Sequence, residues 1–512
     1  MNHHGLGYLD WLVFAGFLLA RFALGAYFSR RQTSTKEYFL ASQSMHWLPV
    51  ALSVMASLLS GLSFMGHPAR VYTKDCALFA YAFSVILIIP IIMYGLLPFY
   101  RGLNVTSAYE YLERRFGLNV RLLASALFIG KRLVWLSMVV LVPSMVLSTI
   151  SGISVEYCIL FVGLATTIYT GLGGMSAMIW ADVMQFVALL IGQVLIIGFV
   201  AARVDGGLGE IVLAGVVDKA PSMDIDFSRL TFWTMLLAGL VLALADLGTD
   251  QISVQLLMST RDEAHARKSL LFNALFKIPG LILLMGMGVA IWVFYRAHPA
   301  EMGLKPGEYD RIVPYFVVTQ LPTGIAGFLI AALLGATMSC FDSGLNSLVT
   351  AFSVDWYQRL IRPEANDQRY LTLAKIWTYA IGTLVTMLSL MVYKLGFNGI
   401  VDTANTYLGM FSGGLVAIFL LGIFTRRTRA LPIAVGIVTS IVVLGLLATC
   451  YKGLLDPYLN GVVGCLVTMT VAYLGSLFAP PLPKERLDGL TLIPSRTSAI
   501  LESKRPTIGE GV

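Results

Sequence analysis

The chain reads Ala56-Ser57-Leu58-Leu59-Ser60-Gly61-Leu62-Ser63 in the middle of an apolar segment that runs from residue 47 to residue 68. A second apolar segment, residues 232–257, ends in Ala245-Asp246-Leu247-Gly248-Thr249-Asp250-Gln251. Small polar runs inside membrane helices predict points where a helix unwinds, because the freed backbone groups then face a cavity, an ion or a substrate. Close packing of helices through small residues is the alternative interpretation.

The composition places both segments in a lipid bilayer. Of the 512 residues, 57% are hydrophobic and 13% are charged, whereas a soluble domain carries about 25% charged residues. A soluble enzyme or a nucleic-acid-binding protein is therefore excluded, and the net charge of +7 fits basic cytoplasmic loops. Apolar stretches of about 20 residues predict thirteen transmembrane helices, at residues 7–28, 47–68, 76–99, 121–149, 154–172, 178–202, 232–257, 271–295, 322–352, 371–394, 400–424, 430–449 and 459–479.

The two interrupted segments are the second and the seventh of these helices. They lie five helices apart, as the corresponding helices of two five-helix inverted repeats do, and such repeats place the transport site at the broken pair. We therefore predict an all-α integral membrane protein with a 5+5 inverted-repeat core, in which the first helix of each repeat is discontinuous. The predicted units are an N-terminal flanking helix and loop (1–45), the first repeat (46–205), an outer loop (206–230), the second repeat (231–425), two C-terminal flanking helices (426–480) and a tail (481–512).

Basic residues predict the orientation. Of the 36 Lys and Arg residues, 21 fall in one set of alternating loops and 10 in the opposite set. The positive-inside rule then puts the N-terminus outside and the C-terminus in the cytoplasm of a multi-pass protein of the cell membrane. The first helix lacks a basic leader and a cleavage site, so we expect it to be retained.

Charged residues inside the predicted helices are the first candidates for function, because a charge in mid-membrane is costly and tends to be functional where it is kept. The interior ones are Lys131, Arg132, Asp182, Asp246, Lys277 and Asp342. Arg21 lies nearer the end of its helix, and we expect its side chain to reach the membrane surface.

The ninth helix contains Ala336-Thr337-Met338-Ser339-Cys340-Phe341-Asp342-Ser343. Positions 336, 339, 340 and 343 share one helical face, which offers oxygen ligands of the kind that hard cations prefer. Asp182, after Gly171-Leu172-Gly173-Gly174, is a further carboxylate for such a site. The alternative is that the serine hydroxyls bond to the backbone of their own helix. The five cysteines and six histidines form no CxxC or HExxH motif, so neither a zinc site nor a disulfide framework is expected.

Several ordered stretches resemble the sodium/solute symporter family from about residue 38 to residue 425. They are Gly171-Leu172-Gly173-Gly174-Met175-Ser176-Ala177-Met178-Ile179-Trp180-Ala181-Asp182-Val183-Met184-Gln185, Thr106 to Phe116, Asp250-Gln251 with Val254-Gln255, and Ser343-Gly344-Leu345-Asn346-Ser347 followed by Asp355 and Tyr357. The resemblance implies the leucine-transporter-type fold, with ten core helices and three flanking ones. It also implies sodium-driven uptake by alternating access.

The resemblance implies two sodium sites that share one serine. The first site consists of the backbone carbonyls of Ala56, Leu59 and Ala336 with the side chains of Ser339 and Cys340. The second site consists of Asp182, Ser339, Asp342 and Ser343. Cys340 stands where the family usually has Ser or Thr, and a thiol is a poor ligand for a hard ion, so we expect a weakened first site. Asp342 stands where hydroxyl residues are usual, and a second carboxylate either binds the cation more firmly or takes up a proton, so proton coupling stays open.

The resemblance also implies a substrate site. Its residues are Ser60, Ser63, Phe79, Arg132, Asp246, Gln251 and Lys277. Arg132 resembles an arginine that meets the substrate carboxylate in sialic-acid-transporting relatives, although pairing of Arg132 with Asp246 is an alternative. Lys277 resembles a sugar-contacting lysine of galactose-transporting members, but Ala82 stands where those members have an acidic residue, which counts against a hexose.

We predict a sodium-coupled secondary active symporter that imports a small organic solute by alternating access. An organic anion, a monocarboxylate or a sialic-acid-like molecule, is favoured over a neutral sugar, and the alternatives are a sugar symporter or a non-transporting membrane sensor with the same fold. No catalytic motif indicates an enzyme. The expected partners are the solute, sodium as coupling ion and the lipid bilayer, with no cofactor and no nucleic acid, and we expect a monomer or a weak oligomer.

Overall fold

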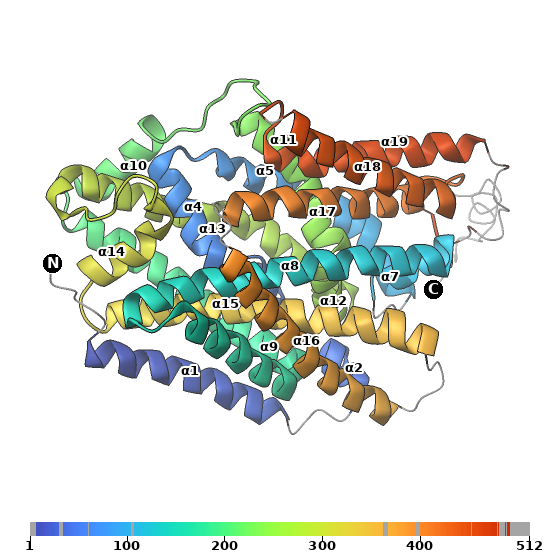
Figure 1. Cartoon of the computed structure of the whole chain (residues 1–512), viewed down its shortest axis with the longest axis horizontal. Coiled ribbons are helices and arrows are strands. Elements are labelled where there is room, and N and C mark those ends of the chain that lie inside the picture. The colour runs from blue at the N-terminus through green and yellow to red at the C-terminus, as the bar shows by residue number, and fades with distance from the viewer. Residues whose placement is uncertain are drawn as a thin grey trace, which may run out of the picture.

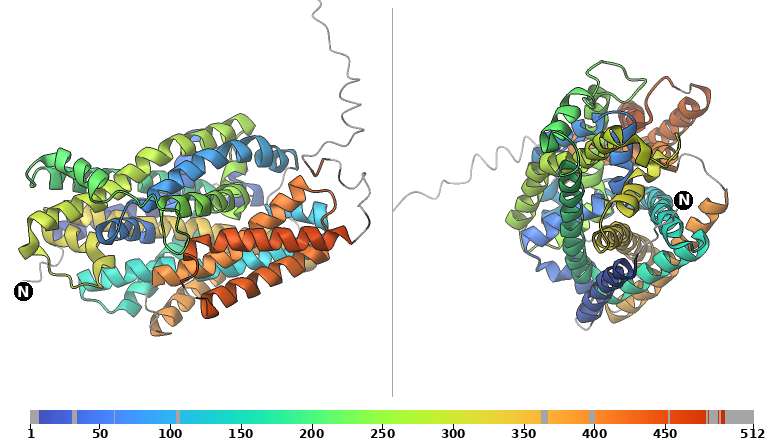
Figure 2. Two further views of the ribbon diagram at one scale, coloured as in Figure 1. Left: turned by 90° about the horizontal axis from the view of Figure 1, so that it is seen from above. Right: turned by 90° about the vertical axis from the view of Figure 1, so that its left-hand side faces the viewer.

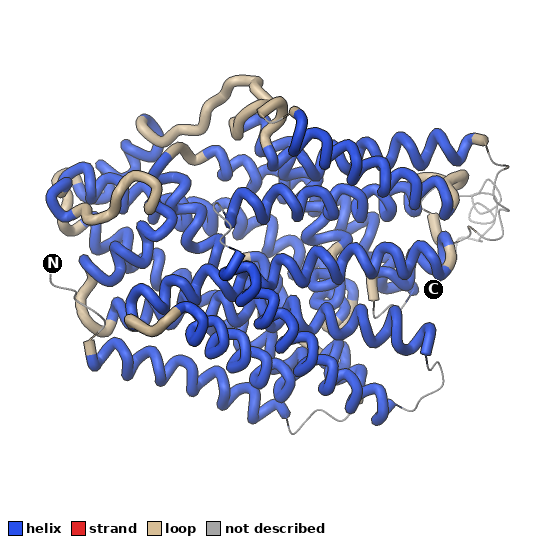
Figure 3. The backbone as a smooth tube through the Cα atoms, viewed as in Figure 1, coloured by secondary structure: helices blue, strands red, loops and turns tan. Residues whose placement is uncertain are grey.

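The structure is a computed structural model that describes residues 7–29, 34–59, 61–103, 107–361, 367–395, 400–451, 453–478, 480, 487 and 489–491. Within these ranges the chain is helical and contains no strand beyond one isolated bridge between Met45 and Thr260 (Figure 3). The long helices run roughly along one axis (Figure 1), and Figure 2 shows them end-on as a single bundle. The predicted all-α membrane class is confirmed.

The helices of the first half of the chain are α1 (Tyr8–Ser29), α2 (Thr35–Leu40), η1 (Ala41–Gln43), α3 (Trp47–Leu58), α4 (Gly61–Thr73), η2 (Ala77–Phe79), α5 (Ala80–Ile91), η3 (Ile92–Leu96), α6 (Leu97–Leu103), α7 (Tyr109–Phe116), α8 (Leu118–Ser151), α9 (Val155–Ala201) and α10 (Gly207–Val217). Those of the second half are α11 (Phe232–Leu244), η4 (Ala245–Thr249), α12 (Gln251–Met258), α13 (Glu263–Ala297), η5 (Pro299–Glu301), η6 (Tyr309–Arg311), α14 (Ile312–Gln320), α15 (Ile325–Thr350), η7 (Ala351–Ile361), α16 (Asp367–Leu395), α17 (Ile400–Phe424), α18 (Ala430–Cys450), η8 (Pro457–Leu459) and α19 (Asn460–Leu477).

Both predicted helix breaks are present. Helix α3 ends at Leu58, α4 begins at Gly61, and the two are bent by 61° relative to each other. Helix α11 passes into the π-helical turn η4, and Asp250 then has an extended backbone (φ −75°, ψ 133°) before α12 begins. Small polar runs therefore mark both interruptions, as the sequence predicted.

The predicted number of thirteen spans is not confirmed. Among the described residues, 10 helices are long and apolar enough to cross a membrane, or 11 if the bent pair α3 and α4 is one span. Two predicted spans, 154–172 and 178–202, form the single run α9, although Gly174 breaks its helical geometry (φ 58°, ψ −163°). The predicted span 400–424 lies partly outside the described side chains, and most of the predicted tail 481–512 lies outside the described residues.

Helix α15 forms the centre of the bundle, since every residue from Leu329 to Thr350 is buried. It packs against α1, α3, α8 and α9. Helices α2 and α7, which come from loops predicted to be cytoplasmic, lie at the end of the bundle opposite α10 and α14, which come from loops predicted to be outside (Figure 1). The polar residues of α15 therefore lie deep inside a membrane-spanning bundle.

Candidate functional site

The carboxylate of Asp182 lies at a meeting point of three helices. Asp182 on α9 is fully buried and accepts a hydrogen bond from Ser53 on α3, at 2.5 Å. It accepts another from Ser339 on α15, and both serines are also fully buried. The structure thus joins the predicted ligands Asp182 and Ser339, and adds Ser53, which sequence reasoning missed.

Glycine makes this approach of α9 possible. Gly174 lies two helical turns before Asp182 and adopts a backbone conformation (φ 58°, ψ −163°) that is essentially restricted to glycine. A Cβ atom at Gly173 would lie 3.3 Å from the Cα of Gly25 on α1. The glycines of the Gly171-Leu172-Gly173-Gly174 stretch therefore let the chain bend and pack closely just before the carboxylate.

The break between α3 and α4 packs directly on α15. A Cβ atom at Gly61 would lie 2.4 Å from Thr337 Oγ1 and 3.1 Å from the carbonyl oxygen of Leu333, so only glycine fits there. The break therefore lies beside the turn of α15 that contains Ala336. At the C-terminal end of α3, the Leu59 amide donates to the Ala56 carbonyl at 3.2 Å. The first predicted sodium site stays a prediction. Cys340, another of its predicted ligands, is buried on α15.

Asp342 has a partner that the sequence did not indicate. Its carboxylate accepts a hydrogen bond from Arg21 on α1, with 2.6 Å between Oδ2 and the guanidinium nitrogen, and both side chains are fully buried. Thr170 on α9 donates to the other oxygen at 2.5 Å. The prediction that Arg21 reaches the membrane surface is wrong, because its guanidinium also donates to the Gly335 carbonyl at 2.9 Å and lies over the ring of Tyr169. The fourth predicted ligand, Ser343, donates to the carbonyl of Ser339 at 3.0 Å.

A cavity of about 210 Å³ opens beside the break in the seventh predicted span. Its polar lining includes the predicted substrate residues Ser63, Arg132 and Asp246. Arg132 is held by Asp250 at 2.5 Å, and Lys131 lies 3.8 Å from the same carboxylate. The acidic partner of Arg132 is thus not Asp246, the alternative from the sequence, but Asp250. The other oxygen of Asp250 caps α12 by accepting from the Ile252 amide.

A second cavity, of about 180 Å³, shares Leu242, Asp246 and Tyr458 with the first. Lys277 lines it, and its ammonium lies 4.8 Å from the centre of the Tyr81 ring. The Tyr81 hydroxyl donates to Asp246 at 3.4 Å. Asp246 therefore stands between a cavity containing Lys277 and a cavity containing Arg132.

Three predicted substrate residues are not placed at these cavities. Gln251 is buried, and its side-chain oxygen accepts a hydrogen bond from the Ala108 amide at 2.7 Å. Phe79 packs edge-on against Phe83, with ring centres 5.7 Å apart, and lines neither cavity. Ser60 lies outside the described residues.

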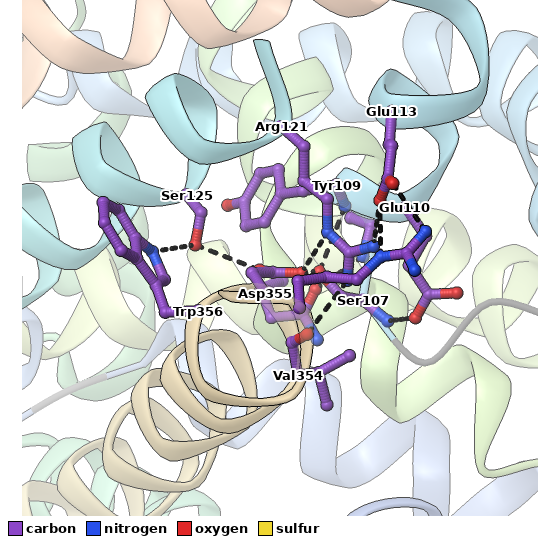
Figure 4. A network of polar contacts seen from close by, with 12 residues as sticks. Ser107, Tyr109, Glu110, Glu113, Arg121, Ser125, Val354, Asp355 and Trp356 are labelled. Carbon is purple, nitrogen blue, oxygen red and sulfur yellow. Dashed lines mark hydrogen bonds and ion pairs between the residues drawn. The ribbon is translucent and has the colours of Figure 1, made fainter. Parts of the chain in front are cut away.

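A further polar network lies at the end of the bundle that carries α7 (Figure 4). Arg121 on α8 binds the fully buried Asp355 of η7 at 2.6 Å and Glu113 of α7 at 2.5 Å. Ser107 and Ser125 each donate to Asp355 at 3.0 Å. The network ties three segments together at the end predicted to be cytoplasmic. Ser107, Glu113 and Asp355 lie in stretches that resemble the family, whereas Arg121 and Ser125 do not.

Comparison with known proteins identifies relatives over nearly the whole chain. The family model "Sodium:solute symporter family" matches residues 38–439. A sodium/sialic acid symporter of Proteus mirabilis is 32% identical over 94% of this chain and 96% of its own length. One of Aliivibrio fischeri is 30% identical over 98% of this chain and all of its own length. A mouse sodium-coupled monocarboxylate transporter is 27% identical over 81% of this chain and 68% of its own.

Solved structures show the same architecture. A Na⁺-coupled sialic acid symporter in a substrate-bound, outward-open state superposes with a TM-score of 0.85 and 30% identity, over 93% of this chain and 99% of that one. The nucleobase-cation-symport-1 transporter Mhp1, in a closed conformation, has a TM-score of 0.53 at 12% identity, over 88% of this chain and 97% of that one. The second likeness concerns the fold alone.

Proposed function

The chain belongs to the sodium:solute symporter family, and from this premise we propose that it imports a small organic anion, with sodium as the coupling ion. Family membership makes it a multi-pass membrane transporter and not an enzyme, as the sequence predicted. The sodium site, the solute and the sidedness are the parts that we propose. We place the protein in the cell membrane with its C-terminus in the cytoplasm, because 21 of its 36 basic residues fall in one set of loops.

The proposed sodium site is centred on Asp182, and one observation supports it most. This carboxylate is fully buried, yet its described hydrogen-bond partners, Ser53 and Ser339, are neutral hydroxyls. An isolated buried carboxylate costs several kcal/mol unless a cation or a proton neutralises it. Carboxylate and hydroxyl oxygens on three helices form a suitable ligand set for a hard monovalent cation.

Sodium at this position would couple ion binding to the arrangement of the helices. Asp182, Ser53 and Ser339 belong to α9, α3 and α15, and α3 ends at the break whose far side, Gly61, packs on α15. A cation held between these three helices favours the conformation in which the break is ordered. The same conformation then forms the substrate cavity. The coupling is then a difference in sodium affinity between the two states of the transporter.

The charges that line the two cavities favour an anionic solute. Lys131, Arg132 and Lys277 contribute three positive charges, and Asp246 and Asp250 two negative ones. The excess of one positive charge matches one carboxylate, which a guanidinium binds through two parallel hydrogen bonds. A neutral sugar would leave that excess unpaired in a buried site, so the anion is the better supported solute. Relatives named for sialic acid and for monocarboxylates point to the same class.

Proteoliposomes containing the purified chain test this function. We expect uptake of a carboxylate solute, from a panel of sialic acids, monocarboxylates, vitamins, amino acids and sugars, driven by a sodium gradient and not by potassium. Arg132→Ala should abolish binding of the anion, while Arg427→Ala, at an exposed loop arginine, should not. Uptake of a sugar with no response to any anion would contradict the proposed solute, and uptake that ignores sodium would contradict the coupling.

The neighbouring carboxylate offers a sharper variant. Asp250→Asn removes the charge that holds Arg132 but keeps a side chain that caps helices as well as aspartate does. We expect this variant to bind the anion more tightly, because Arg132 no longer has an internal competitor. A weaker affinity would mean that Asp250 holds Arg132 in its binding position.

A further inference from the structure

Two buried carboxylates lie at or close to the proposed ion site, and they differ in whether a basic side chain pairs with them. Asp182 on α9 and Asp342 on α15 are both fully buried, and Asp342 is three residues after Ser339, the hydroxyl bonded to Asp182. In the described part of the chain, Asp342 has an ion pair with Arg21, whereas Asp182 has none. One carboxylate therefore has an internal cation and the other lacks one.

Arg21 is built into the site and is not a chance surface contact. Its guanidinium is fully buried and binds the Asp342 carboxylate at 2.6 Å. It also donates to the carbonyl of Gly335 at 2.9 Å, about two turns before Asp342 on the same helix, and lies 5.1 Å from the centre of the Tyr169 ring. These contacts fix a positive charge against α15 at the level of the proposed ion site.

The charge balance limits how many mobile cations the site can take. Asp182 and Asp342 carry two negative charges, and Arg21 carries one positive charge that a guanidinium keeps at all physiological pH values. One negative charge remains. The two sodium sites implied by resemblance share Ser339, and the first of them contains no carboxylate. The remaining charge is therefore available to one mobile cation only.

We propose that Arg21 is a built-in cation that replaces a mobile ion at Asp342, so that the chain binds a single sodium ion per transport cycle, at Asp182. The inference rests on the proposed function, because it takes sodium binding at Asp182 as given. It assigns Arg21 and Asp342 the role of positioning residues that set the stoichiometry of coupling. Neither residue is a sodium ligand in the native chain.

Equilibrium binding of ²²Na⁺ to the purified full-length chain tests the proposal directly. We expect saturation at one ion per chain and a Hill coefficient of about 1, with choline chloride keeping the ionic strength constant. Two ions per chain would overturn the inference. A chain that binds no sodium in preference to potassium would instead contradict the proposed function, so the two failures can be told apart.

Variants of the pair give a second readout. Arg21→Met leaves Asp342 without a cation, and we expect this variant to need a second sodium ion, with a Hill coefficient near 2 and a larger thermal stabilisation by sodium than the wild type. Arg21→Lys keeps the charge, and the double variant Arg21→Met with Asp342→Asn removes both charges, so both should return to one ion. If Arg21→Met folds and still binds one ion with an unchanged Hill coefficient, the pair is only structural and the proposal fails. If it does not fold, the double variant decides: one bound ion supports the charge balance, and two or none contradict it.

Discussion

Replacing Asp355 by alanine should be among the most destabilising single changes at the α7 end of the bundle. Asp355 is fully buried and binds Arg121 at 2.6 Å, and its other oxygen accepts from Ser107 and Ser125 at 3.0 Å each. Removing one partner of a buried ion pair costs about 3–5 kcal/mol. Arg121 keeps Glu113 at 2.5 Å, which argues for the lower end, but two serines lose an acceptor at about 1 kcal/mol each. We expect a loss of about 4 kcal/mol.

Glu113→Ala is the matched control within the same network. Glu113 also binds two arginines, but its side chain is 18% exposed and that of its partner Arg359 is 49% exposed. Exposed ion pairs contribute about 0–1 kcal/mol because solvent screens them. We therefore expect Glu113→Ala to cost about 1 kcal/mol, well below the cost at Asp355.

Unfolding of the purified chain by SDS in mixed micelles measures both losses as free energies of unfolding. A double-mutant cycle of Arg121→Ala and Asp355→Ala should give a coupling of about 2–3 kcal/mol. Arg121→Ala leaves the buried Asp355 without a cation, while Asp355→Ala leaves Arg121 with Glu113 as its remaining carboxylate. The reasoning is that burial makes the Arg121–Asp355 pair contribute strongly to stability. It would be refuted if Asp355→Ala lost no more free energy of unfolding than Glu113→Ala and the coupling were near zero.

The remaining predictions concern the ion site, the bend in α9 and the pH range. Ser339→Ala should weaken sodium binding at least tenfold because it removes a hydroxyl from the proposed site, whereas Cys340→Ser should keep or improve it; the reverse order in a sodium titration would contradict the assignment. Gly174→Ala should cost about 1–3 kcal/mol in the free energy of unfolding because of its backbone strain, while Gly198→Ala, where a Cβ atom meets nothing within 4 Å, should not destabilise. Burial raises the pKa of Glu113, but hydrogen bonds and charges from its two arginines outweigh this effect and lower the pKa below the usual 4.5. Its stabilisation should therefore be constant above about pH 5 and lost only on acidification, which unfolding of Glu113→Gln and the wild type at pH 8, 5.5 and 4 checks.

Local sequence patterns predicted the elements that depend on local physics. Apolar length predicted the spans, and small polar runs predicted the breaks before Gly61 and at Ala245–Thr249, because both signals act within one helix. The predicted count of thirteen spans is not confirmed, in part because the predicted helices 154–172 and 178–202 follow each other in α9 with only a kink at Gly174 between them. A short run of small residues between two apolar segments does not distinguish a loop from a bend.

Partners of buried charges could not be predicted in the same way. Arg21 and Asp342 are 321 residues apart, and Arg132 and Asp250 are 118 apart, so their pairing depends on which helices are neighbours in space. Arg21 was misassigned because its position within α1 resembles that of a residue able to reach the membrane surface. Its burial follows from the packing of α1 against α9 and α15, which no local pattern contains.

The buried carboxylates of the described spans differ in what neutralises them, and this difference gives the strongest indication of where sodium acts. Asp342, Asp250 and Asp355 each bind an arginine, and Asp10 accepts from the backbone amides of Gly7, Gly324 and Gly327. Asp182 has only hydroxyl partners among the described residues. Since an internal arginine is always present, the first three can hold the fold together in every state of the cycle. A carboxylate that lacks one is neutralised by a bound cation or by a proton. With sodium as the proposed cation, the stability of the site depends on the sodium concentration. That dependence is what a sodium-driven transporter requires.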